Sequence, residues 1–246
     1  MKIQKPNTSF QIVAHRGLSQ KYPENTLEGF KAALMQHIDM LEIDVHFTKD
    51  KQLVVIHDDS IDRTSNQKGK VKDFTLEELK QFDFGIKHGE SFKNTCISTF
   101  SEVLSLFKKY SKTLLIEIKK PEQYPGIEKA LLEELDKFQI PSHRVVIQSF
   151  DVESVKKMSE YTKKYALGVL ISKKQYWYKQ PDYENIASFA QFINPNYKLI
   201  NKKFIKRAHE YHLKVIPYTV NKVKDVKKLI HLGVDGIISD IQDAVS

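Results

Sequence analysis

The chain has 246 residues, enough for one large α/β barrel or two smaller domains, and its hydrophobic content of 41% can fill a complete core. It carries 39 Lys and Arg against 31 Asp and Glu, a formal net charge of +8. A single cysteine, Cys96, excludes an intrachain disulfide framework and favours a reducing compartment. We find neither a secretory signal nor an apolar run of about 18 residues. The sequence therefore predicts a cytoplasmic protein without a transmembrane segment.

Strand-like and helix-like segments alternate along the whole chain. The expected strands are residues 10–15, 40–45 with an extension at 52–57, 113–119, 144–150, 166–172, 191–197, 214–220 and 236–240. The expected helices are residues 24–38, 99–111, 126–138, 151–164, 184–191, 201–212 and 223–233, with a short or truncated last helix in 241–246. Eight strand–helix units in this length predict a (β/α)8 TIM barrel. A doubly wound sheet is the alternative, but its usual glycine-rich phosphate turns are missing.

One segment interrupts this alternation after the second strand. Residues 59–99 contain polar turns, a short helix and a loop with Gly85 and Gly89. Thr75 and Glu78 have the spacing of a capping box at the start of that helix. Long structured segments at this face of a barrel usually help to build the site. We expect one barrel domain over residues 1–246, with an insertion at approximately 59–99.

Polar residues with catalytic chemistry end the first three strand segments. His15 and Arg16 end the first, and Glu42 and Asp44 end the second. His57 and Asp58 end its extension, and Glu117 and Lys119 end the third. Because the carboxyl ends of barrel strands meet at one rim, these residues should surround a single site.

The carboxylates in this set predict a bound cation. Glu42 and Asp44 are two residues apart, so they share one face of their strand. Buried carboxylates are costly without a partner, and a hard cation with oxygen ligands is the simplest one. The alternative is a pair of buried salt bridges to Lys119 and Arg16, which would leave the histidines without a role. His46 shares the face of Asp44, and a supporting hydrogen-bonded position is favoured over contact with metal or substrate.

The chain resembles the glycerophosphodiester phosphodiesterase family. The matching segments run in order from near residue 12 to residue 240, so the resemblance covers nearly the whole chain. They are AHRG, PENT, EIDV, TKD, VVIHD, DRTSNQKGKVKDFTLEEL, ISTFSEVL, LLIEIK, QSFD, YTVN and GVDGIISD. The set as a whole is highly specific, although HRG alone is weak. A departure is Tyr218, where the family usually has tryptophan, and this leaves the preferred head group open.

The resemblance implies an enzyme that hydrolyses glycerophosphodiesters to an alcohol and sn-glycerol 3-phosphate. The implied roles are metal ligands for one Ca²⁺ or Mg²⁺ (Glu42, Asp44 and Glu117), an acid–base pair (His15 and His57) and substrate contacts (Arg16, Lys119 and Asn25). The family mechanism implies a first step in which the glycerol 2-hydroxyl attacks phosphorus and forms a cyclic phosphate, which water then opens. His15 is favoured as the acid and His57 as the base in that first step. Glu24 and Asp58 are expected to orient the histidines or the arginine.

Two other functions remain open. One is a related barrel enzyme that acts on lipid phosphodiesters, such as a lysophospholipase D or a phospholipase-like lyase. The other is a non-catalytic barrel that binds phosphate ligands, which is disfavoured because both histidines and all three carboxylates are present. A small-molecule glycerophosphodiester is the expected partner. The sequence carries no signal for the oligomeric state.

Two further segments are expected to lie at the protein surface. Residues 172–185 combine the single tryptophan, Trp177, with tyrosines and lysines. This composition suits a lid over the leaving group, with Trp177 beside it, or contact with a lipid surface, or ordinary packing on the rim. Basic residues also concentrate between Lys198 and Lys228. No nucleic-acid-binding motif accompanies them, so a solvated surface is favoured over nucleic-acid binding, and such a surface could also attract an anionic substrate.

Overall fold

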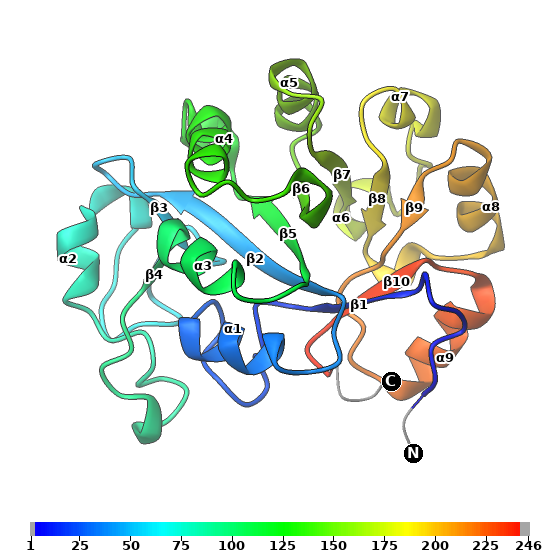
Figure 1. Cartoon of the computed structure of the whole chain (residues 1–246). Helices are drawn as coiled ribbons and strands as arrows, with labels where there is room; N and C mark the ends of the chain where they lie inside the picture. Colours follow the sequence, from blue (N-terminus) through cyan, green and yellow to red (C-terminus); the bar gives the residue numbers. More distant parts are fainter. Residues whose placement is uncertain (1–2, 242–246) are drawn as a thin grey trace.

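The computed structural model describes residues 3–241, which fold around a ring of parallel strands (Figure 1). Neighbouring strands follow the order β10, β1, β2, β5, β6, β7, β8, β9. Their bounds are β1 (Gln11–Ala14), β2 (Met40–Phe47), β5 (Thr113–Ile118), β6 (Val145–Ser149), β7 (Ala166–Ile171), β8 (Phe192–Pro195), β9 (Lys214–Val215) and β10 (Gly236–Ser239). The strand predicted at 214–220 is regular only over its first two residues.

Backbone hydrogen bonds close the ring between β10 and the segment that consists of β9 and the residues directly after it. The N–H of Asp235 donates to the carbonyl of Val215, and the N–H of Ile238 donates to the carbonyl of Pro217, both at 2.9 Å. Neighbouring barrel strands pair in parallel, as between β1 and β10 and between β2 and β5. The predicted TIM barrel is therefore confirmed.

Helices cover the outside of this ring (Figure 1). They are α1 (Leu27–Leu34), α3 (Phe100–Phe107), α4 (Ile127–Lys137), α5 (Val152–Tyr161), α7 (Tyr183–Ala187), α8 (Lys202–Glu210) and α9 (Val223–Leu232). All of them lie inside the predicted ranges except α7, which begins one residue before its predicted range. A further short helix, α6 (Lys173–Tyr176), was not predicted, and the Ser172 side chain caps it by accepting from the N–H of Gln175. The helix expected in 241–246 lies almost wholly outside the described residues.

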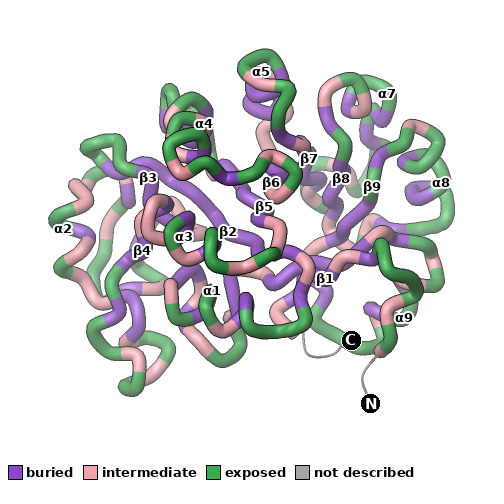
Figure 2. Tube along the Cα trace, in the orientation of Figure 1, coloured by how far each residue is buried: buried purple, intermediate pink, exposed green. Residues whose placement is uncertain are grey.

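The barrel strands are buried, whereas the surrounding helices are exposed along part of their length (Figure 2). Strand alternation divides the core around these strands into two layers. Residues such as Leu41, Ile43 and Val45 face outward and pack against the helices. Met40 faces inward and packs with an interior cluster made by alternate strands, which contains Val13, Met40, Leu115, Val146, Phe192, Ile216 and Ile238. The apolar interior fills one end of the barrel, so polar side chains further along the same strands are gathered at the other end.

The segment between β2 and α3 forms a small unit beside the barrel. β3 (Leu53–Val55) turns back antiparallel to β2, and β4 (Ser98–Thr99) pairs with β3. Between them lie η1 (Val71–Asp73), α2 (Leu76–Lys80) and η2 (Glu90–Phe92). The unit has its own apolar cluster, which consists of Val54, Ile56, Ile61, Val71, Leu79, Phe84 and Ile97. The predicted capping box at the start of α2 is confirmed, while the division into one domain with an insertion stays a prediction.

Residues 52–57 extend the sheet in a way that the sequence did not specify. They do not prolong the second barrel strand but return along it, with Val45 paired to Val55. The remaining turns include η3 (Pro121–Gln123), η4 (Ser142–Arg144) and η5 (Tyr197–Leu199). No helix within residues 3–241 is both long and apolar enough to span a bilayer, and the cytoplasmic location stays a prediction.

The start of α3 gives a stability prediction, because a capping box joins the insertion to the barrel there. The Thr99 hydroxyl accepts from the N–H of Glu102 at 3.1 Å, and the Glu102 carboxylate accepts from the N–H of Thr99 at 2.8 Å. Thr99→Ala should lower the free energy of unfolding by about 1 kcal/mol, measured by urea denaturation. Thr99→Ser keeps the hydroxyl and should stay near wild type. Equal losses in both variants would contradict a capping role.

Candidate active site

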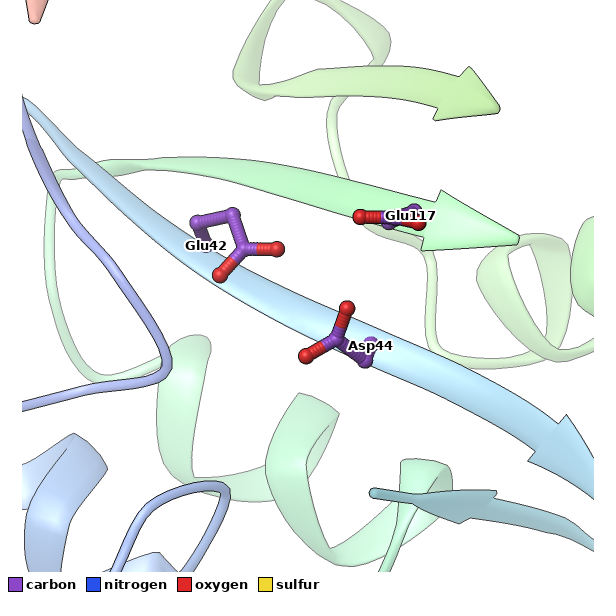
Figure 3. Close-up of side chains that lie close together, drawn as sticks. All are labelled: Glu42, Asp44 and Glu117. Atoms are coloured by element: carbon purple, nitrogen blue, oxygen red, sulfur yellow. The ribbon is translucent and has the colours of Figure 1, made fainter. Parts of the chain in front are cut away.

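Three carboxylates meet inside the barrel, on β2 and β5 (Figure 3). Glu42 and Asp44 point to the same face of β2, and Asp44 lies in register with Glu117 of β5. One oxygen of each can be chosen so that all three lie within 4.8 Å of one another, and all three residues are buried. This buried acidic cluster is compatible with a divalent cation.

The cluster is short of positive charge. Lys119 Nζ lies 2.7 Å from Glu117 Oε1 and 3.6 Å from Asp44 Oδ1, while Arg16 Nε lies 3.3 Å from Asp44 Oδ2. Among the described residues, Glu42 pairs with no cationic side chain and accepts a hydrogen bond from the backbone N–H of Arg16 at 2.9 Å. Asp44 Oδ1 is buried and receives no hydrogen bond from residues 3–241. An unsatisfied buried carboxylate oxygen is costly, and a hard cation would satisfy it.

Burial and charge drive the pKa values of the three acids apart. Burial and the charge of Asp44 raise the pKa of Glu42 well above its usual value. Burial raises the pKa of Glu117 to about 7, because the charge of Lys119 offsets it only in part. Burial acts on Asp44 as well, but the charges of Lys119 and Arg16 outweigh it and lower the pKa. A cation in this cluster would favour the ionised form of all three acids.

The turn after β1 supplies donors to two of these carboxylates. Arg16 and Asn25 both have left-handed backbones, with φ of 57° and 56°, which side chains other than glycine seldom adopt. The N–H of Asn25 donates to the carbonyl of Arg16 at 3.1 Å and ties the two residues together. This arrangement aims the N–H of Arg16 at Glu42, and the Asn25 amide donates to Asp44 Oδ2 at 3.0 Å.

His57 stands beside the carboxylates because β3 runs back along β2. The N–H of Ile56 donates to the carbonyl of Asp44 at 3.0 Å. His57 Nδ1 lies 2.6 Å from Asp58 Oδ1, and this contact favours a proton on Nδ1 and leaves Nε2 for other partners. Burial lowers the pKa of His57, which favours the neutral ring.

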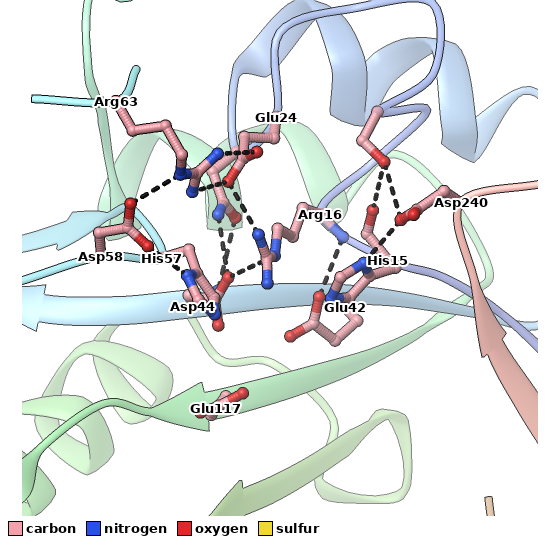
Figure 4. Close-up of polar contacts among 12 residues, drawn as sticks. His15, Arg16, Glu24, Glu42, Asp44, His57, Asp58, Arg63, Glu117 and Asp240 are labelled. Carbon is pink, nitrogen blue, oxygen red and sulfur yellow. Dashed lines mark hydrogen bonds and ion pairs between the residues drawn. The ribbon is translucent and has the colours of Figure 1, made fainter. Parts of the chain in front are cut away.

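His15 has a corresponding arrangement directly after β1 (Figure 4). Its Nδ1 lies 2.6 Å from Asp240 Oδ1, one residue past the end of β10. The same carboxylate accepts from Ser19 Oγ at 3.2 Å and from the side-chain amide of Asn221. Each predicted catalytic histidine is therefore held through Nδ1 by its own aspartate.

Arg63 of the insertion was missed by the sequence analysis, yet it connects the two sides of the site (Figure 4). Its Nε donates to Asp58 Oδ2 at 2.7 Å, and its two terminal nitrogens donate to the Glu24 carboxylate at 2.6 and 2.8 Å. Glu24 in turn accepts from Arg16 Nη1 at 3.0 Å. Burial raises the pKa of Asp58, but hydrogen bonds from Arg63 and His57 outweigh it and lower the pKa to about 2.

His46 is a buried residue that contacts the backbone of His57. The residue is completely buried, its Nδ1 lies 3.0 Å from the Tyr124 hydroxyl and its Nε2 lies 3.1 Å from the carbonyl oxygen of His57. Burial lowers the pKa of His46 to about 4, so the ring is neutral at physiological pH. Its interpretation as a hydrogen-bonded supporting residue is confirmed.

A cavity opens at this end of the barrel. Its lining includes the predicted site residues His15, Arg16, Glu42, His57 and Glu117. The rest of the lining is formed by Gln148, Phe150, Leu170, Tyr218, Thr219 and Ile238. The Tyr218 hydroxyl donates to the carbonyl of Ile171 at 3.1 Å, which fixes its ring in this lining.

The remaining predicted residues lie outside this lining. Asp44, Lys119 and Asn25 lie just behind it, since each contacts another residue of the acidic cluster. Trp177 is 71% exposed and does not line the cavity. The expectation that Trp177 stands beside the leaving group therefore finds no support, because α6 directs it to solvent.

Comparison with known protein families decides what kind of barrel this is. The model of the glycerophosphoryl diester phosphodiesterase family matches residues 15–244. The chain belongs to the glycerophosphoryl diester phosphodiesterase family. The resemblance inferred from the ordered sequence motifs is thereby confirmed.

Relatives within this family match along nearly their whole length. A glycerophosphodiester phosphodiesterase of Caldanaerobacter subterraneus subsp. tengcongensis is 40% identical over 233 residues, which is 93% of each chain. One of Bacillus altitudinis is 38% identical over 237 residues, which is 95% of each chain. A solved Oleispira antarctica phosphodiesterase, in complex with the product sn-glycerol-3-phosphate, has a TM-score of 0.86 and 26% identity, covering 95% of this chain and 94% of its own.

The Arg63 bridge gives a prediction that depends on pH. Arg63→Gln should lower the free energy of unfolding, because Asp58 and Glu24 lose the cation that they share. Both carboxyl pKa values are lowered in the folded protein, so this stabilisation is fully present above a pH of about 4.5, where both acids are also ionised in the unfolded chain. The difference between wild type and variant should shrink as the pH falls towards 2, the folded pKa of Asp58.

Urea denaturation at several pH values would measure this difference. Lys206→Gln is a suitable control, since Lys206 reaches Glu210 only at 3.9 Å on the exposed surface of α8. A stability difference for Arg63→Gln that does not change between pH 7 and pH 3 would contradict the bridge.

Proposed function

We propose that this chain hydrolyses glycerophosphodiesters to an alcohol and sn-glycerol 3-phosphate with the help of one divalent cation. The observation that carries the proposal is one cavity lined by two histidines, each held by an aspartate, and by two acids of the buried cluster. That cluster has fewer cationic partners than carboxylates. Membership of the family supports it, as does the product bound to the Oleispira antarctica phosphodiesterase.

Glu42, Asp44 and Glu117 are the residues that would hold the cation. The orphaned oxygen of Asp44 and the raised pKa of Glu42 both support a further positive charge among them. Their oxygen atoms suit hard cations, Ca²⁺ or Mg²⁺, better than ions that prefer nitrogen or sulfur. When bound, such an ion neutralises negative charge and polarises a phosphoryl oxygen.

Arg16 and Lys119 are the proposed phosphate-contacting residues. A phosphodiester monoanion repels nucleophiles, so basic side chains near its oxygens lower the barrier. Arg16 lines the cavity. Lys119 Nζ is held by Glu117 and lies 5.8 Å from the centre of the Phe150 ring, which is part of the cavity lining. Asn25 contacts Asp44, so its part as a direct substrate contact stays a prediction.

His15 and His57 are the proposed acid and base. In the first step His57 takes the proton of the glycerol 2-hydroxyl, whose oxygen bonds to phosphorus, while His15 gives a proton to the departing alcohol oxygen. A cyclic phosphate results, and the two histidines exchange roles when water opens it. The lowered pKa of His57 supports its part as the base of the first step.

Loss of either histidine should remove most of the activity. His15→Ala and His57→Ala should each lower kcat by about 10²–10⁴-fold, because each group transfers one proton. Release of sn-glycerol 3-phosphate from glycerophosphocholine, followed with a coupled dehydrogenase, measures this effect. The wild-type rate should show a bell-shaped pH profile and should vanish on chelation and return with Ca²⁺ or Mg²⁺.

His231→Ala is a matched control, since this exposed histidine lies in the last turn of α9, away from the cavity. Its kcat should remain at the wild-type value. A His15 or His57 variant that kept more than about a tenth of kcat would rule out that histidine as acid or base. Full activity after exhaustive chelation would overturn the metal-dependent mechanism.

A further inference from the structure

Two aromatic rings project from the barrel rim just after α6. Trp177 is 71% exposed and Tyr178 is 68% exposed, and their rings meet edge to face with centroids 5.3 Å apart. Large exposed apolar side chains that lie next to each other indicate a contact surface. We call these two residues the α6 aromatic pair.

The segment beneath this pair is anchored to the protein. Tyr176 packs against the hydrophobic core, and the Ser172 side chain caps the start of α6. α6 also lies against η5, which follows the next barrel strand. The exposed pair therefore stands on a fixed support, so its exposure is a property of the fold.

Four lysines lie on or next to the segment that carries the α6 aromatic pair. Lys173 and Lys174 lie on α6, and Lys179 follows the pair and stands 5.0 Å from the centre of the Tyr176 ring. Lys198 of the adjoining η5 adds a further charge. All four lysines are exposed, and none forms an ion pair with another residue of the described chain, 3–241. The surface therefore presents two aromatic rings together with four positive charges that are not neutralised by ion pairs.

This surface lies at the catalytic end of the barrel. α6 begins two residues after Ile171, the last residue of β7, and Leu170 of that strand lines the cavity. The starts of α8 and α9 share this rim and carry exposed Lys202, Lys203 and Lys222. A flat partner that contacts the aromatic pair would thus meet further positive charge along the same rim.

We propose that the α6 aromatic pair and its lysines form a docking surface for the headgroup region of an anionic phospholipid bilayer. Trp and Tyr favour this region because each ring has a large apolar part and a polar atom. Lysines next to them are attracted by the negative surface potential of such membranes. The contact holds the cavity mouth close to the bilayer, reversibly and without a spanning helix.

The proposal is independent of the reaction assigned above, since it depends only on the rim. The alternative, in which the pair is a lid over a small leaving group, has the disadvantage that neither ring lines the cavity. The two ideas differ in what changes the environment of Trp177: a bilayer or a soluble glycerophosphodiester.

Trp177 is the single tryptophan of the chain and therefore reports on its own contact. Vesicles of phosphatidylcholine with phosphatidylglycerol should shift its fluorescence emission to shorter wavelength, and vesicles of phosphatidylcholine alone should not. The shift should weaken as salt is added, because lysine–lipid attraction is screened. No shift with anionic vesicles would overturn the proposal, as would equal shifts with both kinds of vesicle. A shift produced by glycerophosphocholine alone would replace it with the lid.

Cosedimentation with the anionic vesicles tests the residues. Lys173→Glu with Lys174→Glu should weaken binding by at least about tenfold. Lys108→Glu with Lys109→Glu, two exposed lysines at the C-terminal end of α3, changes the net charge equally and should bind like wild type. Trp177→Ala with Tyr178→Ala should also lose binding, whereas Met35→Ala, which removes a side chain that is 69% exposed at the end of α1, should not.

All variants should hydrolyse soluble glycerophosphocholine at the wild-type rate, because none of the altered side chains lines the cavity. Equal binding by both lysine double variants would overturn the assignment of this surface. Undiminished binding by the aromatic double variant would do the same.

Discussion

Repulsion among three carboxylates buried on two neighbouring strands is the constraint on which the rest of the site depends. Glu42, Asp44 and Glu117 are held together by the register of β2 with β5, which also forms the barrel wall. The two nearby cations, Arg16 and Lys119, leave one of these charges uncompensated when all three acids are ionised. Folding therefore creates a place for added positive charge, and the proposed divalent ion would supply it beside the cavity.

The insertion completes the site by coming back to it. β3 returns along β2 and brings His57 beside the carboxylates, and Arg63 then connects Asp58 to Glu24 and so to Arg16. The positions of His57 and of Arg16, the proposed phosphate contact, are therefore linked through the guanidinium group of Arg63. Bidentate contact of the guanidinium with the Glu24 carboxylate gives this coupling a defined geometry.

Much of this could be predicted from the sequence, because strand alternation and the C-terminal rim of a barrel follow from short patterns. The barrel, the shared face of Glu42 and Asp44 and the capping box at Thr75 needed only local periodicity. The antiparallel return of β3 and the bridge through Arg63 could not be predicted, since both depend on contacts between distant residues. The exposure of Trp177 could not be predicted either, because aromatic composition fits a lid as well as an outer surface.

The most direct test of the account is to locate a cation in the protein itself. Crystals grown with Mn²⁺, a substitute for Ca²⁺ or Mg²⁺ that also accepts carboxylate ligands, can be measured near the manganese absorption edge. The account predicts one strong anomalous peak among Glu42, Asp44 and Glu117, at roughly 2.0–2.6 Å from an oxygen of each. The peak should be lost in Asp44→Asn. An empty acidic cluster in crystals that hold Mn²⁺ elsewhere would contradict the central claim.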